Sequence, residues 1–194
     1  MKKDRRDFIK MMTVSALATS LGALSASGRE NTPESCMKDA PQRSTVEEAL
    51  SSMQKYGSCC TGVLATYSPE LGIKKDLAAG LGRGMAGGIG GLGHVCGAVS
   101  GAVLVIGLKT TNSDNINDMT AGFKTMDTVM EFVSRFEEKH SSIMCRELIG
   151  HDISTSEKRE AAMKANAYAN CPAFVASAVT ILDEMFSKEE TQGG

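Results

Sequence analysis

The middle of the chain reads GHVCGAVSGAVLVIGL over residues 93–108, and this stretch decides the predicted fold. From about Val95 to Leu108 nearly every residue is apolar, which is typical of a helix that is buried on all sides. The segment directly before it, residues 80–93, contains eight glycines. We therefore predict a glycine-rich loop that leads into a central buried helix.

Further helices are predicted on both sides of this centre. Ser44 with Glu47 and Thr45 with Glu48 both fit the capping box, so a helix should start there and continue toward Tyr56. Other helices are expected over about 59–67, 74–79, 116–139, 155–168 and 172–186. No apolar alternation of period two stands out. The prediction is an all-α domain, a bundle of about six or seven helices.

The clearest helical periodicity lies in residues 116–139. Apolar side chains step there by three and four residues, which predicts one buried stripe. Its members are Ile116, Met119, Phe123, Met126, Met130 and Val133. Ser113 or Asp114 is the expected N-cap. Because the methionines follow the stripe, we interpret them as core residues and not as copper ligands.

Residues 1–28 have the layout of an export signal. A charged start is followed by a weakly apolar run, residues 11–26, and then by small residues. The adjacent Arg5 and Arg6, followed by Phe8, Ile9 and Lys10, resemble the twin-arginine motif. The apolar run is shorter than the ~20 residues of a spanning helix, so we expect a removable signal, although an uncleaved one would tether the protein. The expected location is periplasmic or otherwise extracytoplasmic, reached through the Tat translocase.

The rest of the chain is predicted to be one domain. Residues 29–43 are polar and contain Pro33 and Pro41, so they are interpreted as a linker, with a helical domain over 44–187 and a tail over 188–194. Residues 1–28 hold five basic and two acidic side chains of the chain's 21 and 23, which leaves a net charge of −5 after their removal. That balance excludes a nucleic-acid binder, which carries a basic surface.

Six cysteines are the candidate functional residues. Cys36 lies in the predicted linker, and the others are Cys59, Cys60, Cys96, Cys145 and Cys171. There is no Cys-x-x-Cys pair, so neither a thioredoxin-type motif, a zinc ribbon nor covalent haem is predicted. Several of these thiols stand at expected helix starts, where free backbone N–H groups favour a thiolate and lower its pKa. We expect them to converge on one point, with inert buried cysteines and disulfides as the alternatives.

The cysteine blocks resemble the C_GCAxxG_C_C family of redox-active proteins. The matching blocks, spread over about 45–187, are residues 58–64, 93–102, 106–109, 145–152 and 171–172. The resemblance implies that Cys59 is the family cysteine and that Cys60 is an extra one. The family is similar to the non-haem part of split-Soret cytochromes, which implies an iron–sulfur cluster on Cys59, Cys96, Cys145 and Cys171.

Two other features bear on this centre. Residues 88–93 fit the dinucleotide pattern G-x-G-x-x-G, but the segment before them reads as helix and not as the strand that the pattern requires. We expect instead that glycines such as Gly93 and Gly97 let the backbone approach the centre closely. His94 can replace a cysteine ligand, although a polar surface position is the preferred interpretation.

Three functions follow from these predictions. The first is an electron-transfer protein with an iron–sulfur cluster, the second a metal-free thiol–disulfide oxidoreductase, and the third a non-catalytic module stabilised by zinc or disulfides. The expected partner is another redox protein or a membrane respiratory complex, and pairing with a second copy stays open. No substrate is identified.

Overall fold

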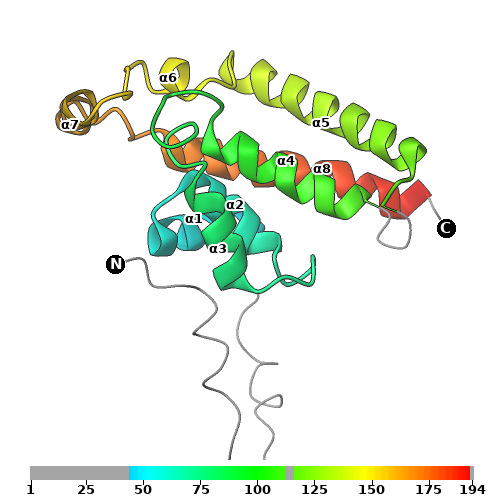
Figure 1. Ribbon diagram of the computed structural model, residues 1–194. Helices are drawn as coiled ribbons and strands as arrows, with labels where there is room; N and C mark the ends of the chain where they lie inside the picture. Colours follow the sequence, from blue (N-terminus) through cyan, green and yellow to red (C-terminus); the bar gives the residue numbers. More distant parts are fainter. Residues whose placement is uncertain (1–43, 112–115, 193–194) are drawn as a thin grey trace, which may run out of the picture. The chain divides into compact units, whose positions relative to one another are not determined.

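Eight α-helices and no strand make up the part of the chain that the computed structural model describes, residues 44–111 and 116–192. The helices are α1 (Thr45–Tyr56), α2 (Cys59–Tyr67), α3 (Lys75–Arg83), α4 (Gly97–Thr110), α5 (Met119–His140), α6 (Cys145–Leu148), α7 (Ser156–Lys164) and α8 (Cys171–Gln192) (Figure 1). The all-α prediction is confirmed. The short α6 is the helix that the sequence did not predict.

Local sequence signals determine α1. The hydroxyl of Ser44 accepts the N–H of Glu47 at 3.2 Å, and the Glu47 carboxylate accepts the N–H of Ser44 at 3.1 Å. This is the predicted capping box. Gly57 ends the helix in the left-handed region, at φ +72°.

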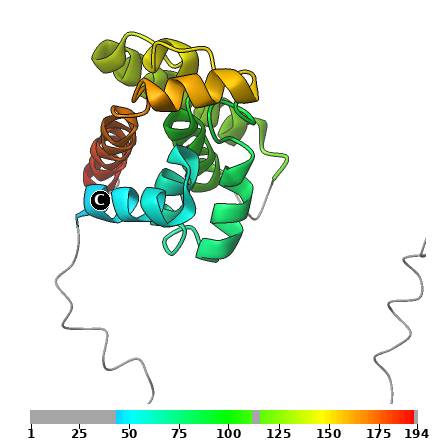
Figure 2. The same ribbon diagram turned by 90° about the vertical axis from the view of Figure 1, so that its left-hand side faces the viewer.

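Helix α4 is the central helix, as predicted. It lies between α5 on one side and the group of α1 to α3 on the other, and it also contacts α8 (Figures 1 and 2). It begins two residues later than expected, because Cys96 is its N-cap. Gly101 allows the close approach of α2, since a Cβ there would lie 2.8 Å from the carbonyl oxygen of Cys60.

The prediction of which face of α5 is buried is wrong. The side chains of Met119, Phe123, Met126 and Met130 are between 59% and 71% exposed, and Ile116 just before the helix is 74% exposed. They are therefore not core residues. The face of α5 that packs against α4 and α8 instead carries the fully buried Phe132 and Phe136, with Val129 and Val133 partly buried beside them.

The physical reason is that α5 carries two apolar stripes. Val129, Phe132 and Phe136 also follow the three- and four-residue spacing of a helix face. Periodicity identifies an apolar stripe but does not say which neighbour covers it. The aromatic stripe fills the space between α4 and α8, and the methionine-rich stripe faces solvent.

The start of α5 also differs from the prediction. Asp118 is its N-cap, and the Asp118 carboxylate accepts the N–H groups of Thr120 and Ala121 at 2.9 and 3.3 Å. The helix therefore begins at Met119. The expected caps Ser113 and Asp114 lie outside the described residues.

Other helix ends differ by a few residues. Helix α3 continues into the glycine-rich segment as far as Arg83, α7 ends at Lys164, and α8 continues to Gln192, past the expected end at Phe186.

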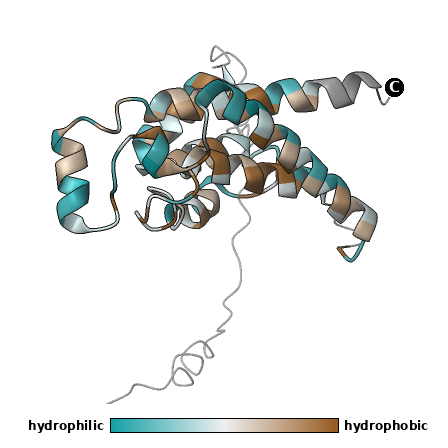
Figure 3. Cartoon of the chain, turned by 90° about the horizontal axis from the view of Figure 1, so that it is seen from above, coloured by the Kyte–Doolittle hydropathy of each residue, from teal (hydrophilic) through white to brown (hydrophobic). Residues whose placement is uncertain are grey.

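Hydrophobic and hydrophilic residues occupy different parts of the helix surfaces (Figure 3). None of the described helices is long and apolar enough to cross a membrane. The predicted signal and linker, with Cys36, lie outside the described residues.

Candidate functional site

Four cysteines from separate parts of the chain line one cavity of about 330 Å³. Cys59, Cys145 and Cys171 are the first residues of α2, α6 and α8, and Cys96 is the N-cap of α4. All four are free thiols. The structure thus brings together the four residues that the family resemblance implies as ligands, and it does so through helix starts.

The remaining wall of the cavity is mostly apolar. Its side chains include Met53, Leu148, Ile149 and Phe174, with Tyr168 beside them. Ser58 also belongs to the cavity wall, and this residue is only 6% exposed. Among the described residues its oxygen has no hydrogen-bond partner. A buried hydroxyl without a partner is destabilising, so the cavity wall contains one polar group whose hydrogen bonding is unsatisfied.

A short backbone contact places Cys96 beside Cys145. The N–H of Cys96 donates to the carbonyl of Ile143 at 2.7 Å, and the N–H of Cys145 donates to the carbonyl of His94 at 2.6 Å. Val95 and Met144 form an isolated antiparallel bridge between these bonds. The two segments are about fifty residues apart in the chain, and no sequence motif indicated that they pair.

The glycine-rich loop has a left-handed backbone conformation next to the paired segments of Cys96 and Cys145. Five consecutive residues, 87–91, have positive φ, and four of them are glycines. At Gly88 a Cβ would lie 2.6 Å from the backbone nitrogen of His94 and 2.9 Å from the Cβ of Cys145. The absence of a side chain at Gly88 therefore lets Cys145 reach its place. The loop follows a helix, α3, so the dinucleotide pattern lacks its strand here.

A hydrogen bond links the thiols of Cys59 and Cys171. It lowers the pKa of Cys171 and, together with burial, raises the pKa of Cys59 well above its usual range. Cys96 and Cys145 add to the rise at Cys59 through charge repulsion. Cys171 is therefore the thiol of this pair that ionises first.

At Cys96 the expectation of a lowered pKa is wrong. Burial raises the pKa of its thiol by more than the backbone N–H groups of Ala98 and Val99 lower it. Burial also raises the pKa of Cys145 to about 12. A helix start favours a thiolate only where water still reaches the sulfur, and these sulfurs lie inside the domain.

Alkaline pH is expected to destabilise the metal-free protein. Burial raises the pKa of both Cys60 and Cys145 to about 12, whereas an exposed thiol has a pKa of ~8.5. Between these values the unfolded chain has lost protons that the folded chain keeps. The free energy of unfolding should therefore fall as the pH rises from about 9 to about 12. Urea unfolding at several pH values, under anaerobic and metal-free conditions, measures this slope.

The control for this prediction is Cys60→Ala. It removes one of the buried thiols, so its free energy of unfolding should fall less steeply over the same pH range. A slope equal to that of the unchanged chain would show that Cys60 ionises as readily in the folded state as in the unfolded state.

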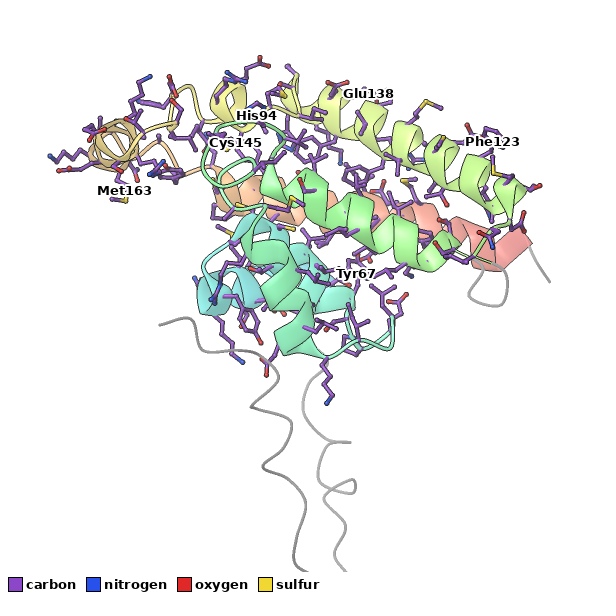
Figure 4. All side chains as sticks on the ribbon, in the orientation of Figure 1. Tyr67, His94, Phe123, Glu138, Cys145 and Met163 are labelled. Carbon is purple, nitrogen blue, oxygen red and sulfur yellow. The ribbon has the colours of Figure 1, made fainter. Side chains whose placement is uncertain are left out.

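The other predicted site residues lie in different surroundings. Gly97 lines the cavity. Gly93, Cys60 and His94 are not among the lining residues. Gly93 faces Arg146, and Cys60 is fully buried on the side of α2 that meets α4. His94 is exposed near Cys145 (Figure 4). Sequence reasoning missed Ser58, whose only signal was its place directly before the first cysteine pair.

Among the described residues, no three His, Cys, Asp or Glu side chains are arranged to hold a single metal ion. Binding of metal by the four cysteines therefore stays a prediction. In comparisons with known proteins, the family model described as "Putative redox-active protein (C_GCAxxG_C_C)" matches residues 57–185. No curated protein and no solved structure matches the chain.

Proposed function

Since the chain belongs to the C_GCAxxG_C_C family, we propose that it is an electron-transfer protein with an iron–sulfur cluster on Cys59, Cys96, Cys145 and Cys171. The observation that carries this proposal is the cavity that all four thiols line. Four separate helices supply these thiols at their starts, and a random placement of inert cysteines has no reason to produce that arrangement.

The residues present fit such a cluster. Four cysteine thiolates are the ligand set of [2Fe–2S] and [4Fe–4S] clusters. A cavity of about 330 Å³ suits a group of several atoms better than one zinc ion, whose sulfur ligands lie ~2.3 Å from the metal. Ser58, whose buried hydroxyl has no partner among the described residues, belongs to the wall beside these thiols.

When bound, an iron–sulfur cluster supplies reversible one-electron transfer. The chain's own residues set the conditions for it. Leu148, Ile149 and Phe174 exclude water from the thiols, and the N–H groups of Ala98 and Val99 favour the thiolate of Cys96. Because burial keeps most of these thiols protonated, loading of metal must release protons.

The test is iron content in single-cysteine variants. The anaerobically purified chain should contain iron and acid-labile sulfide and should absorb visible light. Cys59→Ser, Cys96→Ser, Cys145→Ser and Cys171→Ser should each lose most of the iron and the absorbance. The matched control is Cys60→Ala, because Cys60 neighbours Cys59 but does not line the cavity, and it should keep both.

Two results would refute the proposal. One is a colourless, iron-free chain after anaerobic purification. The other is a loss of iron in Cys60→Ala as large as in the four ligand variants. Circular dichroism of each variant separates loss of the cluster from loss of the fold.

A second function is favoured by the hydrogen bond between Cys59 and Cys171. The lowered pKa of Cys171 suits a thiolate that attacks a substrate disulfide. Attack forms a mixed disulfide and releases one substrate thiol. Cys59 then attacks the Cys171 sulfur, which releases the second thiol and leaves Cys59 and Cys171 oxidised to a disulfide. In a metal-free chain that works this way, Cys59→Ser traps the mixed disulfide on Cys171, and Cys96→Ser and Cys145→Ser stay active.

The N-terminal segment supports a proposal about where in the cell the protein acts. Residues 1–28 resemble a twin-arginine signal, which exports folded proteins with their cofactors loaded. We place the protein outside the cytoplasmic membrane, with a redox protein or a membrane respiratory complex as its electron partner.

A further inference from the structure

A row of large apolar side chains is exposed along the first half of α5. Met119, Phe123, Met126 and Met130 lie on the helix and Ile116 lies just before it, and we call these five residues the α5 stripe. Single exposed apolar residues are common on protein surfaces, but a contiguous stripe marks an interaction site. Phe123 lies toward the end of α5 far from Cys145, so this surface is separate from the cysteine cavity (Figure 4).

The spacing of the stripe points to another helix as its partner. Its four members on the helix, Met119, Phe123, Met126 and Met130, are separated by steps of four, three and four residues. This is the a/d pattern of a coiled coil, which is narrower than the apolar face of a helix packed on a globular core. We propose that the α5 stripe pairs with the α5 stripe of a second copy of this chain, in an antiparallel and closed dimer.

An antiparallel arrangement matches each of the four helical members of the stripe with an apolar residue. With the two-fold axis between Phe123 and Met126, Phe123 faces Met126 of the partner subunit. In the same register Met119 faces Met130 of the partner subunit. Each of these layers joins an a-type to a d-type position, as in antiparallel coiled coils. The stripe is therefore complementary to itself, as a two-fold interface must be.

The charges beside the stripe favour the same register. Lys124 and Asp127 are exposed on one flank, about one turn apart. In the antiparallel dimer Lys124 lies next to Asp127 of the partner subunit, and the two-fold axis repeats this pair. In a parallel dimer the two-fold axis would place the Lys124 and Asp127 of the two subunits on opposite flanks, where they could not pair.

The exposed area is sufficient for association. Five large side chains that are more than half exposed present on the order of 500 Å² per subunit, near the upper end for a monomer. Two such surfaces together bury on the order of 1,000 Å², where specific interfaces begin. The expected dimer is therefore of moderate affinity.

Sedimentation of the full-length chain tests this proposal. The unchanged chain should show twice the 20.5 kDa mass of the monomer. Met126→Glu should weaken the dimer at least tenfold, because it places a charge at the centre of the stripe. The matched control is Met163→Glu on α7, which changes a methionine of nearly equal exposure (64% against 62%) and should leave the dimer intact.

A charge exchange tests the register and the identity of the partner. Asp127→Lys alone should weaken the dimer, since it places two lysines side by side. Combining it with Lys124→Asp should restore the affinity to within a few fold, which happens only when the partner is another copy of the same chain. A chain that stays monomeric at concentrations on the order of 100 µM, or a double variant no better than Asp127→Lys, overturns the proposal. Iron content plays no part in these measurements, so their failure is distinct from failure of the proposed function.

Discussion

Gly88→Ala is expected to lower the free energy of unfolding by about 3 to 4 kcal/mol and to displace Cys145 from the cavity. Gly88 has a φ of +69°, where an alanine is strained. Its Cβ would also lie 2.6 and 2.7 Å from the backbone nitrogen and oxygen of His94. These atoms cannot rotate away as a side chain does, because the His94 carbonyl accepts the N–H of Cys145 and the His94 N–H donates to the carbonyl of Gly88.

Gly90→Ala is the matched control for this prediction. Gly90 has nearly the same backbone conformation, at φ +61°, but a Cβ there meets no atom within 4 Å. It should lose only the conformational part, ~1 to 2 kcal/mol. Urea unfolding of both variants measures the difference, and alkylation of Cys145 should become faster in Gly88→Ala alone. Equal losses of unfolding free energy in the two variants would show that the close approach of Gly88 to His94 and Cys145 adds nothing to the cost of the substitution.

Phe132→Ala is expected to cost about 3 to 5 kcal/mol of unfolding free energy, because its ring is fully buried between α5 and its neighbours. Phe123→Ala on the same helix should cost less than ~1 kcal/mol, since that ring is 59% exposed. Both variants need to be measured at a concentration at which the chain sediments as a monomer, so that loss of the proposed interface does not contribute to the result. A larger cost at Phe123 than at Phe132 would show that the methionine-rich stripe, and not the aromatic one, faces the core.

The two candidate functions make different demands on the cavity. Thiol–disulfide exchange needs one ionised thiol and one resolving thiol, which the hydrogen-bonded Cys171 and Cys59 supply. It has no use for Cys96 and Cys145 in the same wall, where burial suppresses their ionisation. Metal binding uses all four thiols and overcomes that suppression, because the metal replaces the protons. We therefore rank the cluster above the dithiol.

Much of this protein could be predicted from local sequence. The capping box at Ser44, the glycine end of α1 at Gly57 and the apolar run of α4 are signals between residues close together in the chain. Such signals act over one or two helical turns, so they hold whatever the rest of the fold does. The order and setting of the cysteine blocks likewise identified the family.

Only the tertiary structure decided which surfaces meet. The sequence of α5 contains two apolar stripes, and the choice between them depends on the space between α4 and α8. The meeting of Cys96 with Cys145 depends on a backbone pairing between distant segments, and their high pKa values depend on the burial that results. Helix formation depends on neighbours a few residues away, whereas burial depends on the packed chain around each atom, and this is why the helices and the family could be predicted but the buried face of α5 and the ionisation of the thiols could not.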